Sequence, residues 1–156
     1  DVRVLWPGSL VIDVTERIPV APVLAGDLWM LLASDGGVIM EVPAPIGDGP
    51  VIAIDQGALL PGDVVDDPNA VGALVFVEQL STTNRAGAMV RVEGEGLVGE
   101  VGGHEIRLGR PVDMAQKASV LEALLDSGIE PGAFIDLIAP LRPAVTNPQP
   151  QPEVEE

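Results

Sequence analysis

The chain has 156 residues, 47% of them hydrophobic, and a formal net charge of −16 at pH 7. This length and apolar content allow one ordinary hydrophobic core, or two small ones, and exclude a wholly disordered chain. The negative charge makes nucleic acids and anionic lipid headgroups poor partners, and the absence of cysteine excludes disulfide and thiol chemistry.

The first third of the chain is predicted to form short β-strands. Residues 2–6 and 10–16 flank the turn Pro7-Gly8-Ser9 and are expected to pair as a β-hairpin, because apolar and polar residues alternate in the second segment. The sequence Ser-Asp-Gly-Gly at 34–37 is typical of a tight turn between strands. Residues 43–50, rich in Pro and Gly, indicate a loop. Further strands are expected at residues 19–24, 27–33, 38–42 and 51–54.

An α-helix is predicted over residues 67–80. Asp67 is expected to be its N-cap, and Pro68 occupies the first helical position, where the missing N–H costs no hydrogen bond. Val71, Leu74 and Val75 continue the segment with apolar side chains at helical spacing.

Residues 94–103 contain a glycine pattern that resembles a dinucleotide-binding fingerprint. Three glycines fit the spacing G-x-G-x-x-G: Gly94, Gly96 and Gly99. The fingerprint requires a helix to begin at these glycines, whereas residues 100–109 alternate like a strand. Gly102-Gly103 is itself the signal of a two-residue hairpin. We therefore predict two turns that follow a strand at 88–93, and no nucleotide cofactor.

A second helix is predicted over residues 113–127. Asp113 and Gln116 have the spacing of a capping box, with Asp in place of the usual Ser or Thr. Gly128 lies where a left-handed residue commonly ends a helix.

The C-terminal part of the chain is expected to add a last strand at residues 133–138. Residues 143–156 are rich in Pro and Glu and are expected to be a disordered tail, because they have too little apolar surface to offset their ordering entropy. Many hairpin signals with only two capped helices predict the α+β class, with a mostly antiparallel β-sheet and two main helices.

No combination of residues indicates catalysis. His104 is the only histidine and is expected to be an exposed residue on a strand. The serines lack the partners of a catalytic triad. An acidic cluster has a spacing that matches no calcium loop; its members are Asp63, Asp66, Asp67 and Asn69. We therefore expect neither an enzyme nor a metal site.

Four motifs resemble, in order, those of the FtsQ/DivIB family of bacterial cell-division proteins. LWPGSLVIDVTERIPVA (5–21) is similar to the family's junction after its POTRA domain, and LWMLLASDGGVIMEV (28–42) resembles the first hairpin of its β domain. VGGHEIRLGRPVDMAQKASVLEALL (101–125) resembles a strand ending in Leu-Gly, followed by a Lys-bearing helix in which Lys117 holds the usual place. FIDLIAPLRPAV (134–145) is similar to the C-terminal strand of actinobacterial members.

This resemblance implies a domain organisation and a role. Residues 1–21 are expected to be the C-terminal end of a truncated POTRA domain, residues 22–142 an FtsQ-type β domain, and residues 143–156 the tail. The chain would then be the extracytoplasmic part of a single-pass membrane protein at the division septum, whose transmembrane helix lies upstream. Its role would be that of a scaffold linking early and late cell-division proteins, without catalysis.

The resemblance also implies partners and a binding segment. The coiled-coil proteins FtsB and FtsL would bind at the strand that ends the β domain by β-augmentation, and other divisome members through the POTRA domain. The implied contact residues are Asp136, Ala139, Leu141, Arg142, Ala144 and Val145. Pro140 and Pro143 interrupt this segment and are expected to limit its ladder hydrogen bonds. The competing interpretation of Arg142 is an ion pair with Glu153 or Glu155.

The remaining motif residues are expected to be structural. The junction residues are Trp6, Pro7, Glu16, Arg17 and Pro19. Trp6 would pack in the hairpin, Glu16-Arg17 would form a structural ion pair or hydrogen-bond pair at the domain junction, and Lys117 would be solvated or snorkelling.

Two other classes of protein remain alternatives. A POTRA-containing secretion or outer-membrane assembly factor would require repeated POTRA units or a following barrel. An extracytoplasmic enzyme or ligand-binding module would be favoured by aromatic platforms for a sugar, yet the chain has only two Trp, two Phe and no Tyr. The upstream sequence of the full-length protein would distinguish these classes.

Overall fold

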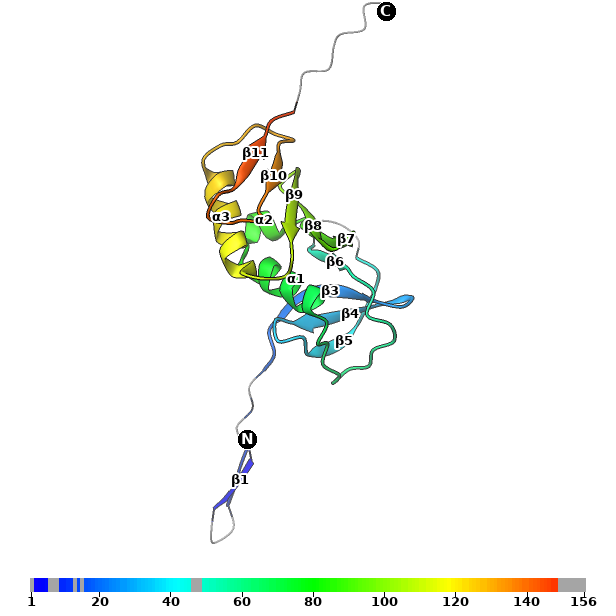
Figure 1. The fold of residues 1–156 in the computed structure, drawn as a ribbon. Coiled ribbons are helices and arrows are strands. Elements are labelled where there is room, and N and C mark those ends of the chain that lie inside the picture. Colours follow the sequence, from blue (N-terminus) through cyan, green and yellow to red (C-terminus); the bar gives the residue numbers. More distant parts are fainter. Residues whose placement is uncertain (1, 6–8, 13, 15, 46–48, 149–156) are drawn as a thin grey trace, which may run out of the picture.

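The computed structural model describes residues 2–5, 9–12, 14, 16–45 and 49–148 (Figure 1). Its strands form a two-stranded hairpin and a nine-stranded sheet. In the hairpin, β1 (Val2–Leu5) pairs antiparallel with β2 (Ser9–Ile12). The predicted N-terminal hairpin is thus confirmed, although its second strand ends at Ile12 and not at residue 16.

The large sheet has the strand order β11-β10-β9-β8-β7-β6-β3-β4-β5. Most neighbours are antiparallel, while β6 is parallel to β3 and β7, and β10 is parallel to β9. Together with the helices, this arrangement confirms the predicted α+β class. The strands are β3 (Pro19–Ala25), β4 (Leu28–Ala33), β5 (Val38–Val42), β6 (Val51–Ala53), β7 (Met89–Glu93), β8 (Gly96–Val101), β9 (His104–Gly109), β10 (Phe134–Asp136) and β11 (Ala144–Thr146).

The first predicted helix is confirmed as α1 (Pro68–Gln79). The Asp67 carboxylate accepts hydrogen bonds from the backbone N–H groups of Asn69 (2.7 Å) and Ala70 (3.0 Å). Pro68 begins the helix as expected, since its ring fixes a helical φ and no intrahelical donor is lost there.

The second predicted helix is confirmed as α3 (Met114–Asp126), but its predicted capping box is wrong. Asp113 has φ 54° and makes no side-chain cap hydrogen bond. Capping side chains usually belong to N-cap residues with an extended backbone, and Asp113 has a left-handed one. Gly128, with φ 78°, is left-handed as predicted.

One helical turn, α2 (Thr82–Arg85), was not predicted. Its cap is partly provided by α3, because the Glu122 carboxylate accepts hydrogen bonds from the Ser81 N–H (2.8 Å) and the Asn84 side chain (2.8 Å). These contacts join residues about forty positions apart. A local reading of the sequence cannot find them.

The hydrophobic core lies between one face of the large sheet and the helices α1 and α3, which contact each other (Figure 1). A single row of opposed residues crosses this face from β5 to β11, because directly paired residues share a face. The row is Glu41, Met30, Val23, Ile52, Val90, Gly99, Ile106, Ile135 and Val145. All its apolar members are buried except Val145 at the β11 end.

Two side chains predicted to be exposed are buried, and those predictions are wrong. His104 is 6% exposed, and its Nδ1 lies 3.2 Å from the carbonyl oxygen of Ala133. Lys117 is 1% exposed and donates to the carbonyl oxygens of Leu108 (2.7 Å) and Arg110 (2.8 Å). Lys117 therefore ties α3 to the end of β9, and burial lowers the pKa of its ammonium group.

No helix in the described part of the chain is long and apolar enough to cross a membrane.

Candidate partner-binding edge

β11 is one of the two edge strands of the large sheet, and it lies inside the segment expected to bind a partner. The predicted last strand, β10, is internal, because it pairs with β9 on one side and β11 on the other. The prediction of a disordered tail over residues 143–156 is wrong for residues 144–146, which form β11. They form a strand because pairing with residues 134–136 gives them hydrogen-bond partners that no local signal shows.

The two prolines of the segment do not interrupt the edge strand. Pro140 lies in the turn between β10 and β11, and Pro143 directly precedes β11. The backbone N–H of Arg142 closes this turn on the Ala139 carbonyl oxygen at 2.8 Å. The expected limit on pairing therefore does not come from the prolines. It comes from the length of β11, which is three residues.

A three-residue edge strand offers few hydrogen bonds to a partner. In an antiparallel ladder, successive residues direct their backbone groups alternately to the two sides. β11 therefore presents either Val145 or both of its neighbours, Ala144 and Thr146, to an incoming strand. Side-chain contacts must supply most of the remaining affinity.

Two exposed apolar side chains at or beside this edge could contact a partner. Leu141, in the turn, is 83% exposed, and Val145 is 38% exposed although it continues the core row. Asp136, at the end of β10, accepts a hydrogen bond from the Ile138 N–H (2.9 Å) and lies 3.7 Å from the Arg107 guanidinium. Asp136 thus stabilises the turn, and the exposed contacts are provided by the turn and β11.

The opposite edge, β5, is covered at its beginning. The N–H of Val38 donates to the Asp63 carbonyl oxygen and the Val38 carbonyl accepts from the Gly62 N–H, both at 2.9 Å. Gly37 forms an isolated bridge with Val64. The core row ends on this side with Glu41, a charged residue that opposes strand addition.

The predicted junction residues are partly described. Trp6 and Pro7 lie outside the described residues. Pro19 begins β3, and Glu16 is exposed. Arg17 forms a structural ion pair with Asp35, in the turn between β4 and β5, so the expected pairing of Arg17 with Glu16 is wrong.

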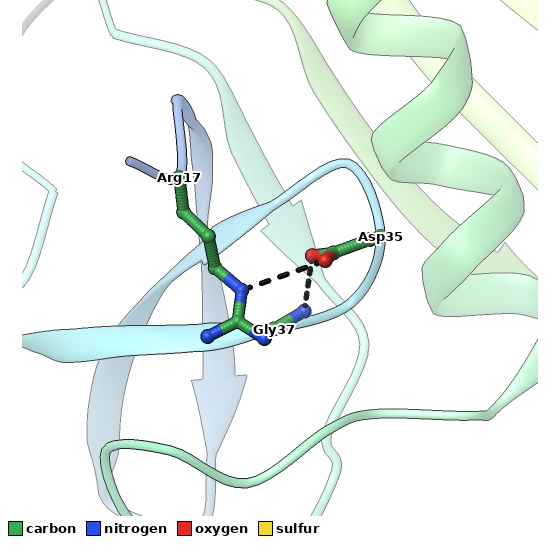
Figure 2. A network of polar contacts seen from close by, with 3 residues as sticks. All are labelled: Arg17, Asp35 and Gly37. Atoms are coloured by element: carbon green, nitrogen blue, oxygen red, sulfur yellow. Dashed lines mark hydrogen bonds and ion pairs between the residues drawn. The ribbon is translucent and has the colours of Figure 1, made fainter. Parts of the chain in front are cut away.

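Arg17, Asp35 and Gly37 form one polar network (Figure 2). The Arg17 Nε lies 3.4 Å from the Asp35 carboxylate, which also accepts the Gly37 N–H at 2.9 Å. These contacts hold the pKa of Asp35 below its ordinary value, with the Gly37 N–H as the main cause. A Cβ atom at position 37 would overlap the Arg17 side chain, so this contact requires glycine.

The other motifs of the sequence form local structure. β8 and β9 follow the glycine turns, and Gly94, Gly102 and Gly103 have positive φ, so the two predicted turns are confirmed. In the acidic cluster, Asp63 accepts the Leu60 N–H at 2.8 Å, and Asp67 caps α1. Among the residues described, no group of three or more His, Cys, Asp or Glu side chains is arranged to hold a metal ion.

Comparison with known proteins adds no family. No protein-family model matches the chain, and no curated protein matches it.

Proposed function

We propose that this chain is a non-enzymatic scaffold of the bacterial division machinery that binds FtsB and FtsL through β11. The proposal rests on the four motifs that resemble the FtsQ/DivIB family, found in the family's order. The single observation that supports it most is the position of β11. It is an edge strand within the segment, Asp136 to Val145, that the resemblance implies for partner binding.

Binding would occur by β-augmentation. An extended segment of FtsB would pair with β11, and its backbone would supply the hydrogen bonds of a tenth strand. Because Val145 ends the core row, an apolar side chain of the added strand would cover it. Leu141 would bury its exposed side chain against the same partner.

Arg142 would contribute by pairing with a partner carboxylate. An ion pair in a partly dry interface is worth about 1–3 kcal/mol. Pairing of Arg142 with Glu153 or Glu155 of the tail is the competing interpretation, and at an exposed site it would be worth about 0–1 kcal/mol. Both glutamates lie outside the described residues.

Matched truncations test this proposal. A chain ending at Pro148 keeps β11 and removes all three glutamates of the tail, whereas a chain ending at Pro143 also removes β11. Titration with the periplasmic part of FtsB, alone and with FtsL, should give wild-type affinity for the first chain and at least a tenfold loss for the second. Circular dichroism and thermal unfolding check that both chains are folded. Equal affinity of the two truncated chains would contradict the proposal.

The same chain ending at Pro148 separates the two roles of Arg142. If Arg142 contacts the partner, Arg142→Glu weakens FtsB binding in this shorter chain as much as in the full chain. An effect that disappears when the tail is removed would assign Arg142 to the tail.

A further inference from the structure

The face of the large sheet opposite the helices changes character along the sheet. Over β7 to β10 it carries mainly charged side chains, as expected for a solvated face. These are Arg91, Glu93, Glu100, Glu105, Arg107 and Asp136. Over β3 to β5 the same face is apolar. Its residues, called here the apolar half-face, are Pro22, Leu24, Trp29, Leu31, Met40 and Val42.

The register assigns these six residues to one face. Leu31 pairs with Pro22 and Met40, and Trp29 pairs with Leu24 and Val42, so they form two parallel rows. The alternate residues of β3 and β4, such as Val23 and Met30, are buried against the helices. No helix of the described residues covers the apolar half-face.

The apolar half-face is only partly covered. Met40 is 52% exposed, and the other five residues are half-buried. A hollow of about 570 Å³ is lined by Pro22, Leu31 and Val42 of this face and by prolines of the segments 43–45 and 49–50. An apolar side chain of a partner therefore has both a surface and a hollow to occupy. Exposed apolar surface of this kind marks interaction sites.

The part of the chain that forms this face is strongly acidic. Residues 18–84 contain no Lys or Arg. They contain nine acidic residues: Asp27, Asp35, Glu41, Asp48, Asp55, Asp63, Asp66, Asp67 and Glu78.

Two of these carboxylates lie near the Trp29 end of the face. Asp27 is in the turn that joins β3 to β4. Asp55 accepts hydrogen bonds from the N–H groups of Gly26 (2.9 Å), in the same turn, and Gly57 (2.8 Å). These bonds lower the pKa of Asp55, so its charge is retained at neutral pH.

We propose that the apolar half-face binds an amphipathic, Lys- and Arg-bearing helix of a partner protein. A helix is the element that already covers the opposite face of this sheet, where its apolar side packs on β3 and β6. The apolar side of the helix would cover Trp29, Leu31 and Met40, and its basic side chains would meet Asp27 and Asp55 at the Trp29 end of the face. A second copy of the chain and an anionic membrane are disfavoured, because both would bring negative charge to an acidic surface. This site is independent of β11.

A synthetic helix tests the proposal. The probe is an amphipathic Leu/Lys peptide, with a Leu/Glu peptide of the same pattern as its control. In a Trp6→Phe background Trp29 is the only tryptophan, so its fluorescence reports binding at the face itself. The Leu/Lys peptide should shift the Trp29 emission to shorter wavelength and saturate, while the Leu/Glu peptide should not bind.

Two variants with the same charge change localise the binding. Met40→Arg places a cation on the face, and Val112→Arg places one in the segment before α3; both side chains are more than half exposed, at 52% and 57%, so folding should be preserved. Met40→Arg should weaken peptide binding about tenfold or more, and Val112→Arg less than about twofold. Thermal unfolding checks the fold of both variants.

Three results would overturn the proposal. The first is no saturable binding of the Leu/Lys peptide. The second is an equal loss of affinity in both variants, which would indicate diffuse electrostatic attraction. The third is a dimer in sedimentation experiments that Met40→Arg dissociates, which would assign the face to a second copy of the chain.

Discussion

The two edges of the large sheet are closed in different ways. At β5, the segment 62–65 supplies backbone hydrogen bonds to residues 36–38, and the core row ends in the charged Glu41. At β11, the core row ends in Val145, which is partly exposed, and the edge is three residues long. Exposed strand edges promote association, and proteins usually protect them with charge or a covering loop. The chain protects one edge by both means, and the less protected edge at β11 is the one at which we propose that the partner binds.

The largest effect on stability is expected for the buried ammonium group of Lys117, which ties α3 to β9 in the part of the sheet that ends at β11. Lys117→Met keeps most of the stem but leaves the carbonyl oxygens of Leu108 and Arg110 without their donor. Chemical denaturation should show a loss of about 1–3 kcal/mol in the free energy of unfolding. An unchanged midpoint would mean that water replaces the ammonium group at no cost.

The contribution of Lys117 to the free energy of unfolding should depend on pH. Burial lowers the folded-state pKa of Lys117 below the value of about 10.4 expected when the chain unfolds. The unfolded chain therefore binds more protons between these two pKa values, and the stability of the wild type relative to Lys117→Met should rise with pH in that window. A relative stability that falls with pH there would contradict the assigned direction.

The contact of Gly36 with the segment 62–65, which covers the beginning of β5, should be nearly as sensitive to substitution. Gly36 has φ 79°, and a Cβ atom there would overlap the carbonyl oxygen of Val65, whose N–H donates to the Gly36 carbonyl at 2.9 Å. Gly36→Ala should cost about 2 kcal/mol of unfolding free energy, from the strained backbone and the displaced segment. Gly57→Ala is the matched control, since Gly57 also has positive φ but open space around it. Equal losses in both variants would show that the Val65 contact contributes nothing.

Exchanging the charged and apolar ends of the core row should alter the two edges in opposite directions. Val145→Glu gives β11 a charged end like that of β5, and it should weaken FtsB binding about tenfold, or about 1.4 kcal/mol, with little change in stability. Glu41→Val removes the charge from β5 and should increase self-association in sedimentation experiments. If Val145→Glu binds FtsB like the wild type, the end of the core row is not part of the interface.

The smallest effect is expected for the ion pair of Arg17 with Asp35, because both side chains are largely exposed. Arg17→Met should leave the free energy of unfolding nearly unchanged at neutral pH, because solvent screens an exposed ion pair. Because the pKa of Asp35 is lowered in the folded protein, the contribution of this pair should be lost as the pH falls below about 4. A clear loss of unfolding free energy in Arg17→Met would show that this network stabilises more of the fold than the turn between β4 and β5.

Local signals in the sequence predicted most of the fold. Asp67-Pro68 and Gly102-Gly103 act through their own backbone, so α1 and the turn between β8 and β9 lie where they were expected. The alternation of His104 with the buried Ile106 and Leu108 could also have shown that His104 faces the core. The prediction of an exposed His104 rested on the usual exposure of single histidines and not on this alternation.

The remaining features depend on residues distant in the sequence. Lys117 is buried because two carbonyl groups at the end of β9 accept hydrogen bonds from its ammonium group, and a helix pattern cannot show that. Residues 144–146 form a strand because β10 pairs with them, although the surrounding prolines and acidic residues are typical of a tail. The edge strand β11, on which the candidate site depends, therefore could not be predicted from local sequence patterns.

Hydrogen exchange at β11 is the most direct test of whether a strand of FtsB adds at this edge. The amide protons to follow are those of Ala144, Val145 and Thr146, measured by NMR in the free chain and in the complex with the periplasmic part of FtsB. If a strand of FtsB adds at this edge, the amides directed away from β10 should exchange rapidly in the free chain and become strongly protected in the complex. Unchanged exchange of all three amides in a saturated complex would contradict this strand addition.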